Sequence, residues 1–274
     1  MRRYDVLLSL AGMTCFLLTY TAQATPQPRM ALIIGNAAYQ RASLRTPVND
    51  ATDTATTLHQ LGFDITMLQD ADLRTMQAAL QMFSQRLRQG GVGLFYFAGH
   101  GVQIRGDMYL MPLGVRLEQE QDIRHEALPV GRVWGDMEDA GNPLNIIILA
   151  ASRNNPFSQS GRSSQRALAA PPSARGMFTA YATAPGAVAL EGTERNSIYT
   201  KYLLRHMTTP GLSLESLFKH VRSAVVEKTQ GRQTPWESSS VADPFYLVPR
   251  SAGTSPPTTP SVTPSPPALP QRER

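Results

Sequence analysis

Short runs of consecutive apolar residues, each ended by glycine or a polar residue, limit most strongly how this chain can fold. The runs lie at 29–36, 63–68, 92–101, 145–150 and 176–186. Continuous apolar runs of this length are typical of strands that are buried on both faces. Segments with helical spacing separate most of these runs. This alternation predicts an α/β domain whose mostly parallel sheet is covered by helices on both faces.

The clearest helical pattern lies at 73–91. It places Met76, Leu80, Phe83 and Leu87 on one face and stops at a glycine pair. A hairpin is expected at 102–112, and residues 153–175 have the composition of a loop. Further helices are expected at 48–62, 126–138, 195–207 and 213–229, and a final strand is expected at 243–248.

Both ends of the chain differ in composition from its centre. Residues 1–24 combine an early basic pair, a short apolar stretch and the small residues Ala22 and Ala24, which is typical of a cleaved secretory signal. We therefore expect a periplasmic or secreted protein with no membrane span after cleavage, since the stretch is short for a transmembrane anchor. Residues 250–274 are rich in Pro, Ser and Thr, as in disordered tails. One domain, 25–249, lies between them.

Charge and cysteine content exclude several classes of function. The formal net charge of the chain is only +5, and its basic residues are scattered, so we expect no nucleic-acid partner. The only cysteine, Cys15, lies in the predicted signal. The mature protein would therefore have no disulfide, no thiolate metal site and no thiol-based mechanism.

Two polar residues follow neighbouring predicted strands. His100 lies between two glycines after the run at 92–101, and Ser152 follows the run at 145–150. The loops after adjacent parallel strands meet at the same edge of a sheet, where open α/β folds place their sites. We therefore expect His100 and Ser152 to lie close together.

The order of the sequence blocks resembles that of a known family. The blocks ALIIGNAAY, PVNDATDTATTLHQLGF, LFYFAGHGVQIRGDMYLMP, RNNPF, AYATAPGAVALEG and NSIYTKYLL are similar to those of the caspase-like cysteine peptidases, specifically the bacterial metacaspase-like (orthocaspase) branch. The resemblance implies a caspase-like three-layer sandwich with about six strands. It also implies a histidine–cysteine pair that cleaves after Arg or Lys, with acidic residues binding that side chain.

The chain departs from this family at the residues that carry the chemistry. Where the family commonly has Asp-Ala-Cys-Arg, this chain has Ala150-Ala151-Ser152-Arg153. Ser152 therefore stands at the nucleophile position, and Ala150 stands at one acidic position of the substrate pocket. The other acidic position matches Asp50, and Asp53, one helical turn further on, is a candidate substitute for the lost carboxylate.

A serine hydroxyl is much harder to deprotonate than a thiol, so an active serine needs a well-oriented base. We expect no carboxylate that orients His100. The leading hypothesis is an inactive caspase-like pseudoenzyme that binds a peptide or a protein with a basic segment. The alternatives are an active hydrolase that uses Ser152 with His100 as its base, and a structural protein of the envelope.

Simpler roles remain open for these residues. Asp50 is of the acidic type that the helix dipole favours in the first turn of a helix, and Ser152 is of a type that is common in loops. We predict no cofactor, although relatives that need calcium exist and its ligands do not map onto this sequence. The other histidines show no metal-binding spacing. The oligomeric state is left open.

Overall fold

The computed structural model describes residues 27–115, 119–154 and 175–250 of the 274-residue chain. The predicted signal and most of the predicted loop at 153–175 lie outside these residues, and so does the predicted tail beyond residue 250. Within the described ranges, no helix is both long and apolar enough to cross a membrane.

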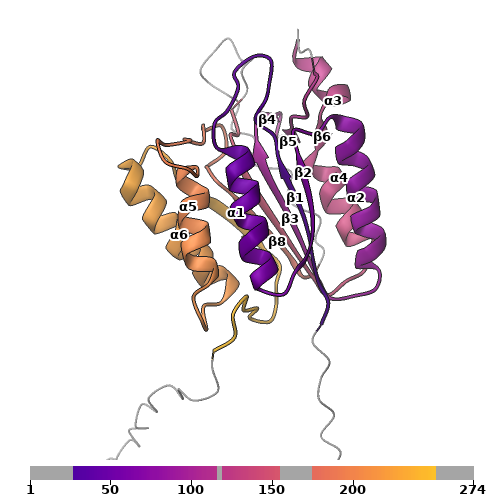
Figure 1. Cartoon of the computed structure of the whole chain (residues 1–274), viewed down its shortest axis with the longest axis vertical. Coiled ribbons are helices and arrows are strands. Elements are labelled where there is room, and N and C mark those ends of the chain that lie inside the picture. The colour runs from indigo at the N-terminus through magenta and orange to yellow at the C-terminus, as the bar shows by residue number, and fades with distance from the viewer. Residues whose placement is uncertain (1–26, 116–118, 155–174, 251–274) are drawn as a thin grey trace, which may run out of the picture.

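A six-stranded sheet forms the centre of the domain and confirms the predicted α/β class (Figure 1). Its strand order is β2-β1-β3-β7-β8-β9. The first five strands are parallel, and β9 pairs with β8 in the antiparallel direction. The strands are β1 (Arg29–Gly35), β2 (Asp64–Gln69), β3 (Val92–Gly99), β7 (Leu144–Ala151), β8 (Met177–Tyr181) and β9 (Trp236–Ser239).

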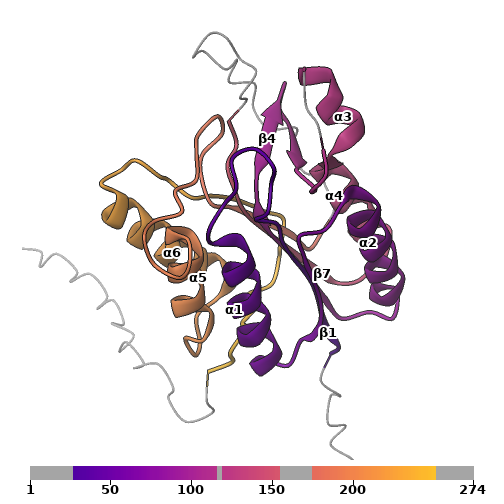
Figure 2. The same ribbon diagram turned by 45° about the horizontal axis from the view of Figure 1, so that its top comes forward.

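Helices cover the two faces of this sheet, which makes a three-layer sandwich (Figures 1 and 2). One face packs against α1 (Pro47–Gln60), α5 (Ile198–Met207) and α6 (Leu214–Thr229). The other packs against α2 (Leu73–Leu87) and α4 (Val130–Glu138). Because the inner strands are buried on both faces, they carry the continuous apolar runs seen in the sequence.

The predicted hairpin is present in a second, three-stranded sheet. Its strands are β4 (Gly101–Ile104), β5 (Asp107–Leu110) and β6 (Leu128–Pro129). The turn residues Arg105 and Gly106 both have positive φ, at 53° and 100°, as a tight two-residue hairpin turn requires. A short 3-10 helix, Glu120–Asp122, and α3 (Ile123–Glu126) precede β6.

Two expectations about elements were wrong. The helix expected at 126–138 begins only at Val130, because residues 128–129 pair with β5. The final strand is β9 and not 243–248. In that segment Phe245 and Leu247 pack against the core beside α5 and α6 without a strand of their own. Strand β9 is polar and partly exposed at the sheet edge, so it gives no apolar run.

Candidate functional site

The ends of β3 and β7 bring the two predicted residues to one place. Gly99 and Ala151 are register partners in the parallel pair, and His100 and Ser152 follow them directly. The packing there is tight, since a Cβ atom on Gly101 would lie 2.5 Å from the carbonyl oxygen of Ser152. The histidine loop therefore rests against the backbone of the serine loop.

A cavity of about 250 Å³ opens at this edge of the sheet, and all four predicted site residues line it. His100 and Ser152 come from the strand ends, Ala150 from β7, and Asp50 from the first turn of α1. The loop after β8 closes another side with Val188, which is half exposed. The structure places these four positions around one cavity, and their assignment to a functional site stays a prediction.

A backbone carbonyl orients the His100 ring. Its Nε2 atom lies 2.6 Å from the carbonyl oxygen of Ala42. A carbonyl oxygen can only accept, so Nε2 carries the hydrogen and Nδ1 of the neutral ring is the acceptor. Tyr39 supports the loop, because its hydroxyl oxygen accepts from the His100 backbone N–H at 3.1 Å and its ring packs 4.5 Å from the imidazole.

The Ser152 hydroxyl is bound by another loop. Its Oγ accepts a hydrogen bond from the backbone N–H of Ala189 at 3.1 Å. Among the residues that the structure places, no hydrogen bond joins Ser152 to His100. In this arrangement the serine oxygen is an acceptor for a peptide group, and its proton is not yet shared with the imidazole.

Arg153 fixes the loop that carries Ser152. Its backbone N–H donates to the carbonyl of Ala187 at 2.8 Å, and its own carbonyl accepts from Gly186 at 3.1 Å. The guanidinium is fully buried and lies 4.2 Å from the ring of Tyr181. Burial lowers the pKa of Arg153 to about 10. These contacts hold the serine loop against the loop after β8.

Asp50 is a buried carboxylate that lines the cavity from the first turn of α1. Its side chain is 1% exposed, and Oδ1 accepts from the backbone N–H of Ser197 at 2.9 Å, just before α5. Burial raises the pKa of Asp50 to about 6, and its hydrogen bonds with Ser197 act in the opposite direction. In the described part of the chain, no Lys or Arg forms an ion pair with it.

Sequence reasoning missed a second carboxylate, Glu191. It lines the same cavity from the loop after β8. Its Oε1 accepts from the backbone N–H groups of Arg45 and Thr46 at 2.7 and 3.1 Å, and Oε2 lies 4.0 Å from the Arg45 guanidinium. The sequence did offer one indication of Glu191, because it follows a predicted core strand and therefore belongs to the same edge of the sheet as His100.

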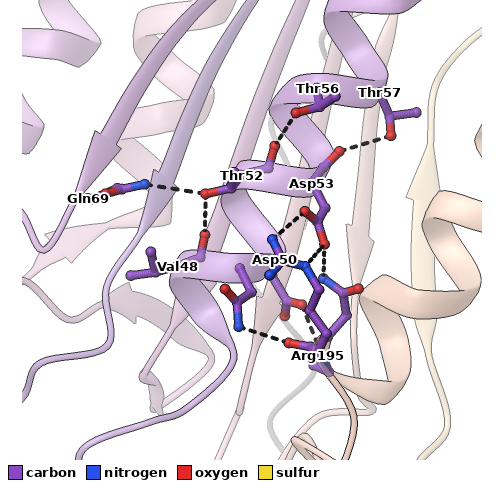
Figure 3. A network of polar contacts seen from close by, with 11 residues as sticks. Val48, Asp50, Thr52, Asp53, Thr56, Thr57, Gln69 and Arg195 are labelled. Carbon is purple, nitrogen blue, oxygen red and sulfur yellow. Dashed lines mark hydrogen bonds and ion pairs between the residues drawn. The ribbon is translucent and has the colours of Figure 1, made fainter.

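Asp53 does not replace the carboxylate that is missing at Ala150. It lies outside the cavity and binds Arg195 through two hydrogen bonds of 2.9 and 2.8 Å and Asn196 through one of 2.9 Å (Figure 3). The hydrogen bond from Arg195 lowers the pKa of Asp53. Its role is to attach the segment before α5 to α1, which holds the Ser197 N–H against Asp50.

The sandwich topology, the glycine-flanked histidine and the residue that ends the neighbouring strand together define a caspase-like domain. The chain belongs to the caspase-domain family, whose model matches residues 28–246. Caspase-1 from Spodoptera frugiperda has the same fold, with a TM-score of 0.62 over 84% of this chain and 95% of that chain, at 15% identity.

Two curated relatives are similar in sequence. The mucosa-associated lymphoid tissue lymphoma translocation protein 1 of Homo sapiens is 31% identical over 137 residues, and its Mus musculus homologue is 30% identical over 135. Each match covers 48% of this chain but only 16% of the relative's length. The caspase-like assignment is therefore confirmed for the domain, and the activities of the longer relatives are not carried over.

As a family, caspase-like proteins need no organic cofactor, although some relatives need calcium. Over the residues that the structure describes, no group of three or more His, Cys, Asp and Glu side chains could hold a metal ion.

Proposed function

We propose that this protein is an exported caspase-domain pseudoenzyme that binds a basic side chain of a peptide or partner protein in the cavity beside His100. The observation that carries the proposal is a buried carboxylate, Asp50, that faces a cavity without a cationic partner among the described residues. A buried charge is costly unless it is paired, so a guanidinium or ammonium group from outside complements it.

Glu191 adds a second negative charge to the same cavity. The backbone N–H groups of Arg45 and Thr46 hold one of its oxygens, which leaves the other near the exposed Arg45 side chain. Ala150 contributes only a methyl group where the family commonly has an acid. The pocket is therefore still acidic, although its acids stand at different positions.

The replacement of cysteine by serine supports the absence of peptidase activity. A thiolate forms readily beside a histidine and is a strong nucleophile, whereas a serine needs a base that already shares its proton. The Oγ of Ser152 instead accepts from the Ala189 amide. Each 1.4 kcal/mol of lost transition-state stabilisation costs about tenfold in rate.

A serine hydrolase is the second candidate, and the orientation of His100 favours it. The hydrogen bond to the Ala42 carbonyl keeps Nδ1 free to accept a proton. In an active hydrolase, the Ser152 hydroxyl would have to donate its proton to this nitrogen.

Hydrolysis of Arg- and Lys-terminated reporter peptides separates the two candidates. The mature protein is compared with the Ala150→Asp, Ser152→Cys double variant, with and without calcium. We expect cleavage only by the double variant, because it regains the thiol and the second pocket acid. Cleavage by the unmodified protein, together with labelling of Ser152 by a fluorophosphonate probe, would establish the hydrolase instead.

Binding is measured separately by calorimetry with a blocked, arginine-containing peptide at pH 7.5. We expect Asp50→Asn to weaken peptide binding by about 10- to 100-fold, because a charge-assisted hydrogen bond is lost. Asp107→Asn, on the exposed start of β5, serves as the control and leaves affinity unchanged. If the peptide does not bind, or if Asp50→Ala leaves partner capture intact, the structural envelope role gains support.

A further inference from the structure

A second cavity lies on the outer side of α5 and α6, away from the strand ends. It has a volume of about 640 Å³ and is lined by residues of the two helices and of the turn that ends α6. Two histidines meet in it, His206 from the last turn of α5 and His220 from the middle of α6. Their ring centres are 5.5 Å apart, with an angle of 25° between the ring planes.

We propose that His206 and His220 form a two-imidazole binding site for a divalent transition-metal ion such as Cu²⁺, Ni²⁺ or Zn²⁺. The site bridges α5 and α6, and the remaining coordination positions are filled by water. This proposal is independent of the peptide-binding role proposed for the other cavity.

The separation of the rings fits a shared ion. Two imidazole nitrogens that each lie about 2.0–2.1 Å from a tetrahedral ion place their ring centres about 5 Å apart. The observed separation of 5.5 Å is close to this value, but the two rings are stacked, so each must turn before both present a nitrogen to one ion. The Cβ–Cγ torsion of histidine is broad and His220 is exposed, so we expect this turn to leave the helices in place.

The surrounding charges indicate which ions fit. Arg205 and Lys228 line the cavity with positive charge, and Glu227 is the acid beside them. Hard cations such as Ca²⁺ and Mg²⁺ are usually held through carboxylates, and Glu227 is the only carboxylate among the residues that line this cavity. Imidazole nitrogen suits copper, nickel and zinc, and the general order of divalent affinities places Cu²⁺ first.

The test is calorimetric titration of the tag-free mature chain with Cu²⁺, Ni²⁺ and Zn²⁺, followed by thermal unfolding with Zn²⁺. We expect one ion per chain, bound most tightly for Cu²⁺, and a rise in Tm. His206→Gln and His220→Gln should each weaken binding by about tenfold or more and remove the rise in Tm. His59→Gln, an exposed histidine in the last turn of α1, is the matched control and should change neither measurement.

Two results overturn the proposal. One is the absence of stoichiometric Cu²⁺ binding to the unmodified chain. The other is binding that persists unchanged in either His206→Gln or His220→Gln, because the ion would then lie elsewhere. If inorganic phosphate binds to the chain and none of the metal ions does, the cavity is instead an anion site formed by Arg205 and Lys228.

Discussion

Individual hydrogen bonds determine how the side chains are held in the cavity beside His100. The His100 ring is held by the carbonyl oxygen of Ala42, which fixes its tautomer without any acidic side chain. The Ser152 oxygen accepts a hydrogen bond from the Ala189 amide. Asp50 keeps its carboxyl group in a buried position where ionisation is costly. A backbone group from another segment therefore holds each of these three side chains.

The cost of ionising Asp50 predicts a pH-dependent stability. Its pKa of about 6 in the folded protein lies above the value of about 4 for an unfolded aspartate, so the folded state binds the proton more tightly. This stabilisation is fully present below about pH 4 and is lost as the pH rises through about 6. Asp50→Asn keeps an acceptor for the Ser197 N–H and cannot ionise.

We therefore expect Asp50→Asn to raise the free energy of unfolding at pH 7.5, by up to about 3 kcal/mol, and to have little effect at pH 4. Chemical denaturation at both pH values measures the difference. A variant that is less stable than the unmodified protein at pH 7.5 would show that the carboxylate is already paired in solution.

At the scale of the elements, the site depends on how closely the ends of β3 and β7 approach. A Cβ atom on Gly101 would lie 2.5 Å from the Ser152 carbonyl and 3.0 Å from the Ala151 Cβ. Neither contact is with the end of a flexible side chain, so the strand ends would have to separate. The glycine thus allows the start of β4 to pack closely against the end of β7 and the serine that follows it.

Gly101→Ala should therefore destabilise the domain by about 1–3 kcal/mol, as expected for overpacking. Gly131→Ala is a suitable control, because Gly131 is exposed on α4 and a Cβ there meets nothing within 4 Å. That change should be neutral or should stabilise the helix by up to about 1 kcal/mol. Urea denaturation of the two variants measures both effects, and equal stabilities would disprove the close contact.

At the scale of the whole molecule, the sequence predicted those elements whose side chains are apolar because they are buried. Strands β1, β3, β7 and β8 are buried on both faces, so their apolar runs located them and, with the glycine-flanked histidine, located the site. Strand β9 was missed because an edge strand can be polar. The sequence could not reveal that the carbonyl of Ala42 holds His100, since every residue has a backbone oxygen. Glu191 was missed because its loop position shows no periodicity.

The buried carboxylate of Asp50 also sets stability against binding. Exchange of one of its oxygens for an amide nitrogen is expected to stabilise the folded domain at neutral pH. Under the proposed binding role, the same exchange removes the negative charge that a bound cation would meet. On that proposal, the carboxylate lowers the stability of the domain and makes its cavity complementary to a basic side chain.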